Sequence, residues 1–286
     1  MVQAERDRKK ELGQFLRTRR ERLNPDAVGF PLGGRRRTAG LRREEVAVLA
    51  GVSTTWYTYL EQGRDVNASP SVLNSIAAVL QLSDDERRYM QLLAYGKVEP
   101  ALPENPEHPV NEMLAQIVAM ADKHPYPVYM GDRRLDLIAW NRSTTEWYED
   151  WEKYPPDERN LIHWLLISPR AREALVDWEN TTKDVLARWR SEIARYPNDK
   201  LIENRISRLA ALSPDFIRYW EARDVADHHS AIRHLRHPRL GEKRMQILPV
   251  SSYYGNSPSL IYHFPIDLSG NNHSAHTPAQ APGQLS

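Results

Sequence analysis

Hydrophobic positions in residues 43–62 repeat with the spacing of two short helices that meet at a tight turn. Gly51 stands where a left-handed C-cap residue belongs, and Ser53 is placed to N-cap a second helix that turns Tyr57 and Leu60 inward. The apolar face of the first helix consists of Val46, Ala47, Leu49 and Ala50. This spacing is typical of a helix-turn-helix. The alternative is an αα-corner in another kind of helical protein.

Three more helices are predicted around this motif. An amphipathic pattern runs from residue 11 to residue 23. Ser69-Pro70 begins a fourth helix, and Ser83 with Glu86 forms a capping box for a fifth helix that ends near Gly96. The arginines of the first helix are expected to point largely outward: Arg17, Arg19, Arg20 and Arg22. Residues 1–96 are therefore predicted to form an all-α, five-helix helix-turn-helix domain.

The rest of the chain has a different pattern. Residues 97–109 contain four prolines without periodicity, which predicts a semi-rigid linker. A helix is expected at 111–124, strands at 127–131, 134–141, 230–237, 243–251 and 259–265, and helices at 142–151, 160–167, 169–194, 200–212 and 214–225. Strands at both ends with inserted helices predict an α+β domain with an antiparallel sheet over 110–266. Residues 267–286 are polar and aperiodic, as in a disordered tail.

Composition narrows the function. The net charge is +1, but residues 1–64 hold 14 Lys and Arg against 8 Asp and Glu, and the remainder holds 25 against 30. A basic segment joined to a mildly acidic one is typical of a nucleic-acid-binding module with an attached domain. The absence of cysteine excludes disulfides and thiolate sites. With no apolar run of membrane-spanning length and no signal peptide, we expect a cytoplasmic protein without a membrane partner.

Several stretches of the sequence resemble a known family. GGRRRTAGLRREEVAVLAGVSTTWYTYLEQG is similar to the N-terminal signature of MmyB-like transcription regulators, within the xenobiotic-response-element (Cro/repressor-like) helix-turn-helix group. YMGDRRLDLIAWN, NLIHWLLISPRAREALVDWE, LSPDFIRYWEARDV and LRHPRLGE resemble the second half of that family. The resemblance implies a bacterial regulator whose C-terminal domain is PAS-like and holds a small apolar ligand, such as a fatty acid.

A helix-turn-helix places its second helix in the DNA major groove. The repressor-like pattern implies base readers at Thr54, Thr55 and Tyr59. Contacts to the DNA backbone or minor groove are expected from Arg43, Ser53, Trp56, Arg64, Arg35, Arg36 and Arg37. The last three lie on a Gly-flanked loop, which is either a minor-groove arm or a solubilising loop. A dimer would place two such helices on two half-sites of a double-stranded operator.

The second domain holds seven of the eight tryptophans, which serve either as core or as the lining of an apolar cavity. The residues expected to line a cavity are Tyr129, Ile138, Trp140, Trp164 and Trp220, with Arg218, Arg223 and His234 as possible anchors for a carboxylate. The histidines His228, His229, His234 and His237 lack the carboxylates of a metal site, so no metal or other cofactor is expected.

The predicted function is a DNA-binding transcription regulator that senses a small apolar ligand such as a fatty acid. Catalysis is not expected, because the chain has no nucleophile elbow, Walker loop or Rossmann glycine set. One alternative remains open: a DNA-binding regulator whose second domain only dimerises or recruits another protein.

Overall fold

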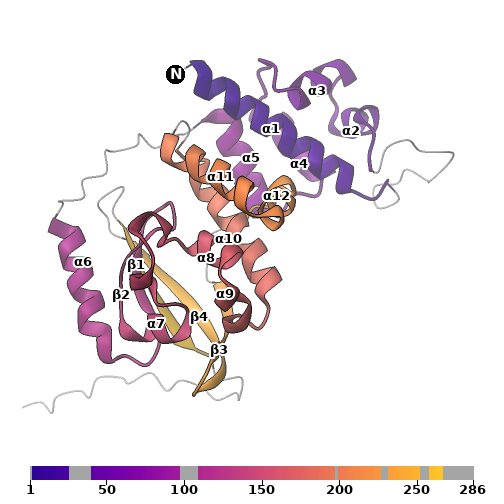
Figure 1. Ribbon diagram of the computed structural model, residues 1–286. Helices are drawn as coiled ribbons and strands as arrows, with labels where there is room; N and C mark the ends of the chain where they lie inside the picture. The colour runs from indigo at the N-terminus through magenta and orange to yellow at the C-terminus, as the bar shows by residue number, and fades with distance from the viewer. Residues whose placement is uncertain are drawn as a thin grey trace, which may run out of the picture.

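The chain folds into a helical domain and an α+β domain that lie against each other (Figure 1). This computed structural model describes residues 2–25, 40–96, 109–196, 199–226, 231–251 and 258–266. The predicted fold class is confirmed: a helix-turn-helix region is followed by a domain with a five-stranded antiparallel sheet. The predicted linker lies outside the described residues as far as residue 108, and so does the predicted tail at 267–286.

Five helices form the first domain: α1 (Val2–Arg22), α2 (Arg43–Ala50), α3 (Thr54–Glu61), α4 (Pro70–Val79) and α5 (Asp84–Tyr95). Contrary to the prediction, α1 begins nine residues before Glu11. Residues 2–10 show no apolar repeat in the sequence, so periodicity did not predict this part of the helix. Polar contacts hold it in the structure. Lys9 Nζ lies 2.6 Å from Glu5 and 2.7 Å from Asp65, and Arg8 Nε donates a 2.8 Å hydrogen bond to the carbonyl of Leu93.

All five helices contribute side chains to the core of this domain, in which α1 packs against α3 and α5. Its fully buried side chains include Phe15, Leu16, Val46, Ala47, Tyr57, Leu73, Ile76 and Met90. Gly13 lies at the closest approach of α1 to α3, where an added Cβ would stand 2.3 Å from the carbonyl oxygen of Glu61. Glycine is therefore required at this crossing for steric reasons.

The second domain begins with α6 (Pro109–Met120) and a short 3₁₀ turn, η2 (Ala121–Lys123). Its strands are β1 (Val128–Gly131), β2 (Leu137–Trp140), β3 (Ala231–His237), β4 (Gly241–Ser251) and β5 (Ser259–Pro265). Between β2 and β3 lie α7 (Arg142–Trp147), η3 (Trp151–Lys153), η4 (Pro156–Glu158), α8 (Leu161–Ile167), α9 (Pro169–Ala174), α10 (Trp178–Ile193), α11 (Lys200–Leu212) and α12 (Pro214–Glu221). No helix in the described part of the chain is long and apolar enough to cross a membrane.

The sheet has the strand order β2-β1-β5-β4-β3, and every neighbouring pair is antiparallel. Successive side chains of a strand point to opposite faces, and this sheet buries parts of both. One face contributes Tyr129, Leu235 and Met245 to the larger core beneath the inserted helices. The other face packs Val128 and Leu260 into a smaller core that includes α6. The inserted helices and the inner face therefore enclose the interior of this domain.

The predicted helix over 169–194 is wrong in one respect, because it is broken between α9 and α10. At the break, Leu175 forms an isolated bridge with Leu235 of β3, and the Val176 N–H donates a 3.0 Å hydrogen bond to the carbonyl of His234. Two other helices end earlier than predicted. The helix predicted at 142–151 ends at Trp147, and the one predicted at 214–225 ends at Glu221.

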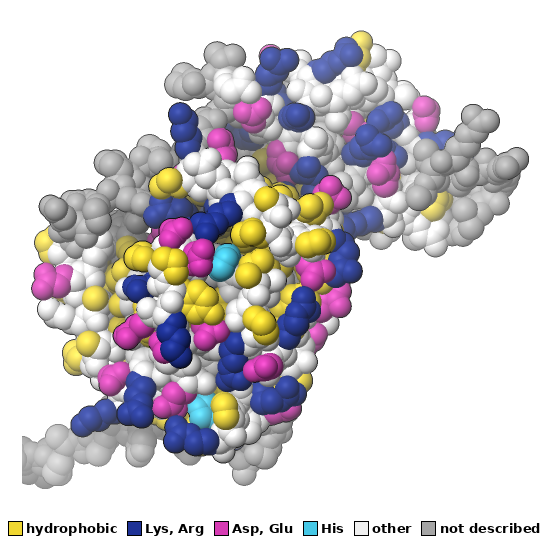
Figure 2. Space-filling view, viewed as in Figure 1, with side chains coloured by type: hydrophobic (Ala, Val, Ile, Leu, Met, Phe, Trp, Pro, Cys, Tyr) yellow, Lys and Arg dark blue, Asp and Glu magenta, His cyan; other side chains and the backbone are white. Residues whose placement is uncertain are grey.

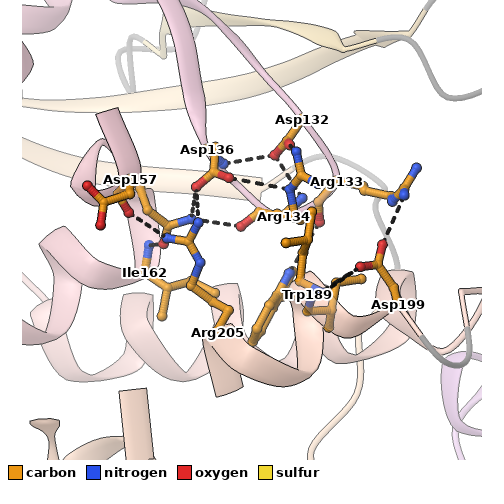
Figure 3. A network of polar contacts seen from close by, with 12 residues as sticks. Asp132, Arg133, Arg134, Asp136, Asp157, Ile162, Trp189, Asp199 and Arg205 are labelled. Carbon is orange, nitrogen blue, oxygen red and sulfur yellow. Dashed lines mark hydrogen bonds and ion pairs between the residues drawn. The ribbon is translucent and has the colours of Figure 1, made fainter. Parts of the chain in front are cut away.

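A polar network ties the β1–β2 turn to the helices (Figure 3). The Asp132 carboxylate accepts backbone hydrogen bonds from Arg134 and Asp136 inside the turn. Arg205 of α11 lies 2.6 Å from Asp136, and Trp189 Nε1 of α10 donates to the carbonyl of Arg133 at 3.2 Å. The pKa of Asp132 is raised, mainly by burial and secondly by the negative charge of Asp136, while the positive charge of Arg134 opposes the shift. This turn is a fixed support for α10 and α11.

Candidate functional site

The turn between α2 and α3 has the predicted geometry. Gly51 adopts the left-handed conformation at φ 70°, and the Val52 N–H donates a 2.9 Å hydrogen bond to the carbonyl of Ala47. Ser53 caps α3, since its Oγ accepts a 3.2 Å hydrogen bond from the Trp56 N–H. Tyr57 and Leu60 point into the core. This part of the chain is a helix-turn-helix.

The predicted base readers lie on the outward side of α3. Thr55 is exposed, Tyr59 is 38% exposed, and Thr54 is half-buried at the start of the helix. The exposed Arg64 places its guanidinium over the Tyr59 ring, 4.4 Å from the ring centroid. This surface presents hydroxyl groups, one aromatic ring and one cation. Trp56, by contrast, is half-buried against the core, which limits its reach toward DNA.

A buried carboxylate that the sequence reasoning missed fixes the position of α3. Glu61, at the end of α3, lies 2.6 Å from Arg20 Nε of α1 and 2.7 Å from Arg43 Nε of α2. The Arg20 and Glu61 side chains are almost fully buried, whereas that of Arg43 is 37% exposed. The Arg43 side chain therefore forms an internal ion pair and is also partly exposed on the surface where phosphate contact is expected.

Two groups of arginines precede the helix-turn-helix in the sequence. Arg35, Arg36 and Arg37 lie outside the described residues. On α1, the expectation of largely outward arginines is wrong for Arg19 and Arg20, which are both buried. Arg19 forms an ion pair with Glu86, and Arg20 forms one with Glu61. Their acidic partners are 67 and 41 positions away, so helical periodicity alone gave no sign of the pairing.

A cavity lies inside the second domain, between the inner face of the sheet and helices α8 and α10. Its volume is about 40 Å³. Aromatic and aliphatic side chains form most of its wall: Tyr129, Tyr148, Leu161, Trp164, Leu165, Leu175, Val185 and Ile247. Thr181, Arg233 and His263 complete the lining. The space is mainly apolar with a few polar groups, as small-molecule sites generally are.

Among the described residues of the cavity wall, Arg233 carries the one permanent charge. Its Nη1 lies 2.9 Å from the Asp184 carboxylate of α10, and its side chain is 12% exposed. Trp164 adds a second polar feature, since its indole Nε1–H is buried and has no hydrogen-bond acceptor among the described residues. Buried donors are nearly always satisfied by protein, water or ligand. The cavity wall thus contains a cation that is paired with Asp184 and a tryptophan whose buried N–H has no acceptor among the described residues.

His263 is held neutral in the wall of the cavity. Its pKa is lowered from 6.5 to about 3, mainly by burial; the hydrogen bond with Pro127 opposes the shift, and the charge of Arg233 adds to it. Because the Pro127 carbonyl only accepts, His263 Nδ1 must carry the proton of that 3.0 Å hydrogen bond. Nε2 then accepts from the Tyr148 hydroxyl at 2.6 Å. Burial also raises the pKa of Tyr129 to about 12, so both groups stay uncharged near neutral pH.

Two family models match the chain. The model described as the MmyB-like transcription regulator ligand binding domain matches residues 112–253, and a helix-turn-helix domain model matches residues 11–90. The chain belongs to the MmyB-like transcription regulators. No curated protein matches it. The two matches show a DNA-binding module joined to a ligand-binding module, in the order that the sequence predicted.

Within the MmyB-like ligand-binding domain, the cavity brings together two of the predicted lining residues, Tyr129 and Trp164. Ile138 falls at a bulge in the β1–β2 pairing and is 48% exposed. Trp140 lies half-buried beside Arg159, and Trp220 stacks on Phe216 at 5.3 Å. Ile138, Trp140 and Trp220 are not part of the wall of this cavity.

The three predicted anchors also lie away from the cavity of this MmyB-like chain. Arg218 lies on the surface of α12 beside Asp215, at 2.8 Å. Arg223 adopts φ 52° and points at α1, and His234 lies 3.4 Å from Glu242 on the solvent side of β3. Arg233, one residue before His234, occupies the inner face instead. Strand alternation and a predicted register could have separated these two neighbours.

His237 has a structural role in this MmyB-like domain. Its Nδ1 accepts backbone hydrogen bonds from Arg239 at 3.0 Å and Leu240 at 3.1 Å, in the turn that joins β3 to β4. His228 and His229 lie outside the described residues. Across the described ranges, no group of three His, Cys, Asp or Glu residues is placed to hold a metal ion.

Proposed function

We propose that the chain regulates transcription from the cytoplasm as a homodimer that binds a double-stranded operator, and that a small apolar acid in the cavity modulates this binding. A fatty acid is the ligand class that we favour. The observation that carries the proposal is Arg233, a cation in the wall of an otherwise mostly apolar cavity. Asp184 pairs with this charge at 2.9 Å, and a ligand carboxylate would compete with Asp184 for the guanidinium while a hydrocarbon tail fits the apolar part of the wall.

The size of the cavity defines what binding must do. Drug-sized ligands occupy roughly 300–1,000 Å³, whereas this cavity measures about 40 Å³. A fatty acid therefore binds a widened form of the domain. Because a ligand shifts an equilibrium through its different affinities for two states, the need to widen the cavity makes occupancy a conformational signal.

The readout of the proposed regulator is the DNA surface of α3. Thr54, Thr55 and Tyr59 would read bases, while Ser53, Arg43 and Arg64 would contact phosphate. Regulation of this kind requires only binding at two sites, so we infer no catalytic step for the chain.

The alternative function rests on a different observation. Figure 2 shows hydrophobic side chains gathered on the face formed by the inserted helices of the second domain. The exposed apolar residues of the inserted helices include Ile167 of α8, Leu201 and Leu212 of α11, and Ile217 of α12. Exposed apolar patches mark protein interaction sites. A second domain that only dimerises or recruits another protein would use such a face and would have no need of a ligand.

Native mass spectrometry of the purified protein, followed by denaturing extraction and lipid analysis, tests the proposal. We expect a stoichiometric apolar acid, or uptake of one from a panel of fatty acids. Arg233→Gln should weaken that uptake at least tenfold. Arg236→Gln is the matched control, because Arg236 lies on the same strand but on the surface, paired with Glu242 at 2.8 Å. A protein that takes up no acid from the panel favours the recruitment alternative.

A further inference from the structure

The two domains meet through a cluster of charged side chains centred on Glu11 of α1. One Glu11 oxygen lies 3.1 Å from Arg190 Nη1 of α10 and accepts a 3.1 Å hydrogen bond from the Tyr89 hydroxyl. The other oxygen pairs with Arg223, which follows α12. The Arg190 side chain is only 6% exposed. Glu11 thus joins the DNA-binding domain to two elements of the ligand-binding domain.

Further contacts fix the orientation of α1 at this junction. Arg19 donates a 2.8 Å hydrogen bond to the carbonyl of Arg223, and Arg22 lies 2.6 Å from Asp224. Ala194 and Val225 of the second domain pack against the core of the first. The domains therefore share both polar and apolar contacts, and their connection does not depend on the linker alone.

Helix α10 belongs to both the cavity and this junction. Its Thr181 and Val185 line the cavity, and its Asp184 holds Arg233. Arg190, on the same helix, reaches Glu11. Val185 and Arg190 are five residues apart, which is about 7.5 Å along an α-helix. A displacement of α10 at the cavity can therefore reach the junction directly, because both lie on the same helix.

The junction end of α10 is held by aromatic contacts. The Trp189 and Trp220 rings lie 5.4 Å apart, and the Arg190 guanidinium lies 3.7 Å from the centroid of the Trp220 ring. Arg190 also donates a hydrogen bond to the carbonyl of Trp220. Because these contacts restrict its rotamer, Arg190 must follow α10 and α12 when they move.

We propose that α10 transmits the state of the cavity to the DNA-binding domain, with the Arg190–Glu11 contact as the point of transfer. This inference rests on the proposed ligand site. An anion that binds Arg233 competes with Asp184, and a widening cavity presses on Thr181 and Val185. The resulting shift of Arg190 alters its hold on Glu11 and hence the tilt of α1. The recognition helix follows, because Arg20 of α1 holds Glu61 of α3.

Hydrogen exchange of the full chain tests the transfer without any ligand. Asp184→Asn weakens the bond to Arg233, as a competing anion would. We expect faster amide exchange in residues 11–20 of α1, and no such change when Arg190→Gln is already present. Asp157→Asn is the matched control, because Asp157 pairs with Arg208 at 2.9 Å on α11, a helix away from the cavity wall. If Asp184→Asn unfolds the domain, Val185→Leu applies pressure to the same helix face.

A second experiment measures the binding of decanoate and of a duplex selected from a random DNA pool. We expect wild type and Arg190→Gln to bind decanoate with affinities within about twofold of each other. DNA affinity should change about 5- to 150-fold on decanoate binding in wild type and less than twofold in Arg190→Gln. An equal change in both proteins overturns the transfer through Arg190.

The two experiments separate this inference from the proposed function. If decanoate and the other fatty acids do not bind wild type, the proposed ligand class is wrong, and the exchange comparison still decides whether α10 couples the domains. Unchanged exchange in α1 after both Asp184→Asn and Val185→Leu overturns the inference even if the acids bind.

Discussion

Arg20 and Glu61 form a buried ion pair, with Arg20 Nε 2.6 Å from Glu61 Oε1, that ties α1 to the recognition helix. Removing one partner of a buried pair leaves the other charge without compensation. Because the pair joins α1 to α3, its loss should affect both the stability of the first domain and the position of the recognition helix.

Glu61→Gln should lower the free energy of unfolding of the DNA-binding domain by about 3–5 kcal/mol, since Arg20 then remains buried beside a neutral amide. Urea unfolding of the full chain measures the loss. Glu44→Gln makes the same chemical change at an exposed position of α2 and should have an effect below about 0.5 kcal/mol. Similar losses in the two variants would show that the buried pair has no special weight.

Gly13→Ala should impair DNA binding, because the new Cβ would lie 2.3 Å from the Glu61 carbonyl oxygen and force α1 away from α3. Gly51→Ala provides the comparison. At Gly51 no atom lies within 4 Å of an added Cβ, and only the left-handed φ of 70° opposes alanine, at a cost of about 1–2 kcal/mol. Fluorescence anisotropy with a selected duplex should rank Gly13→Ala as the weaker binder, and the reverse order would contradict the steric argument.

Thr55→Ala and Arg43→Ala should weaken DNA binding in different ways. Thr55 faces outward on the recognition helix, so its loss should change preference at one base position by about fivefold or more. Arg43→Ala should weaken binding to all sequences alike and reduce the slope of log affinity against log salt concentration by about one. Competition against single-base variants of a selected duplex measures both. A uniform loss for Thr55→Ala would remove it from the base readers.

The stability of the second domain should fall as the pH is lowered below about 6.5. An unfolded histidine takes up a proton near pH 6.5, whereas buried His263 does so only at about 3. Between these values the unfolded chain binds more protons, so His263 contributes a loss of up to about 1.4 kcal/mol per pH unit. Above pH 6.5 both states are neutral and this contribution vanishes.

Urea unfolding at pH 7, 6 and 5 tests the dependence. His263→Gln keeps a donor for the Pro127 carbonyl and an acceptor for Tyr148 but has no titrating group. Its unfolding free energy should decline less steeply than that of wild type. Parallel slopes for the two proteins would mean that His263 takes up its proton while the domain is still folded.

Local signals in the sequence predicted the local parts of the fold. Gly51, Ser53 and the Ser83–Glu86 capping box act within a few residues, and the structure confirms each of them. Strand alternation likewise placed β3 and β5 to within one residue. These features depend on backbone conformation and side-chain spacing, both of which a single stretch of sequence contains.

Contacts between distant residues could not be predicted in this way. Glu11 and Arg223 are 212 positions apart, and the break before α10 depends on a bridge from Leu175 to Leu235. The cavity shows the same limit, since Arg233 and His234 are adjacent in the sequence but occupy opposite faces of β3. Charge and residue type do not reveal a partner until the topology brings the two segments together.

The charged junction around Glu11 changes how salt titrations of this protein must be interpreted. Added ions weaken contacts between arginine and DNA phosphate, and they also screen the partly exposed pair of Arg22 and Asp224. If DNA binding alters the junction, ions are exchanged at two places within one equilibrium. The slope of affinity against salt then measures counterions released from DNA together with ions gained or lost between the domains, so it overstates or understates the number of phosphate contacts.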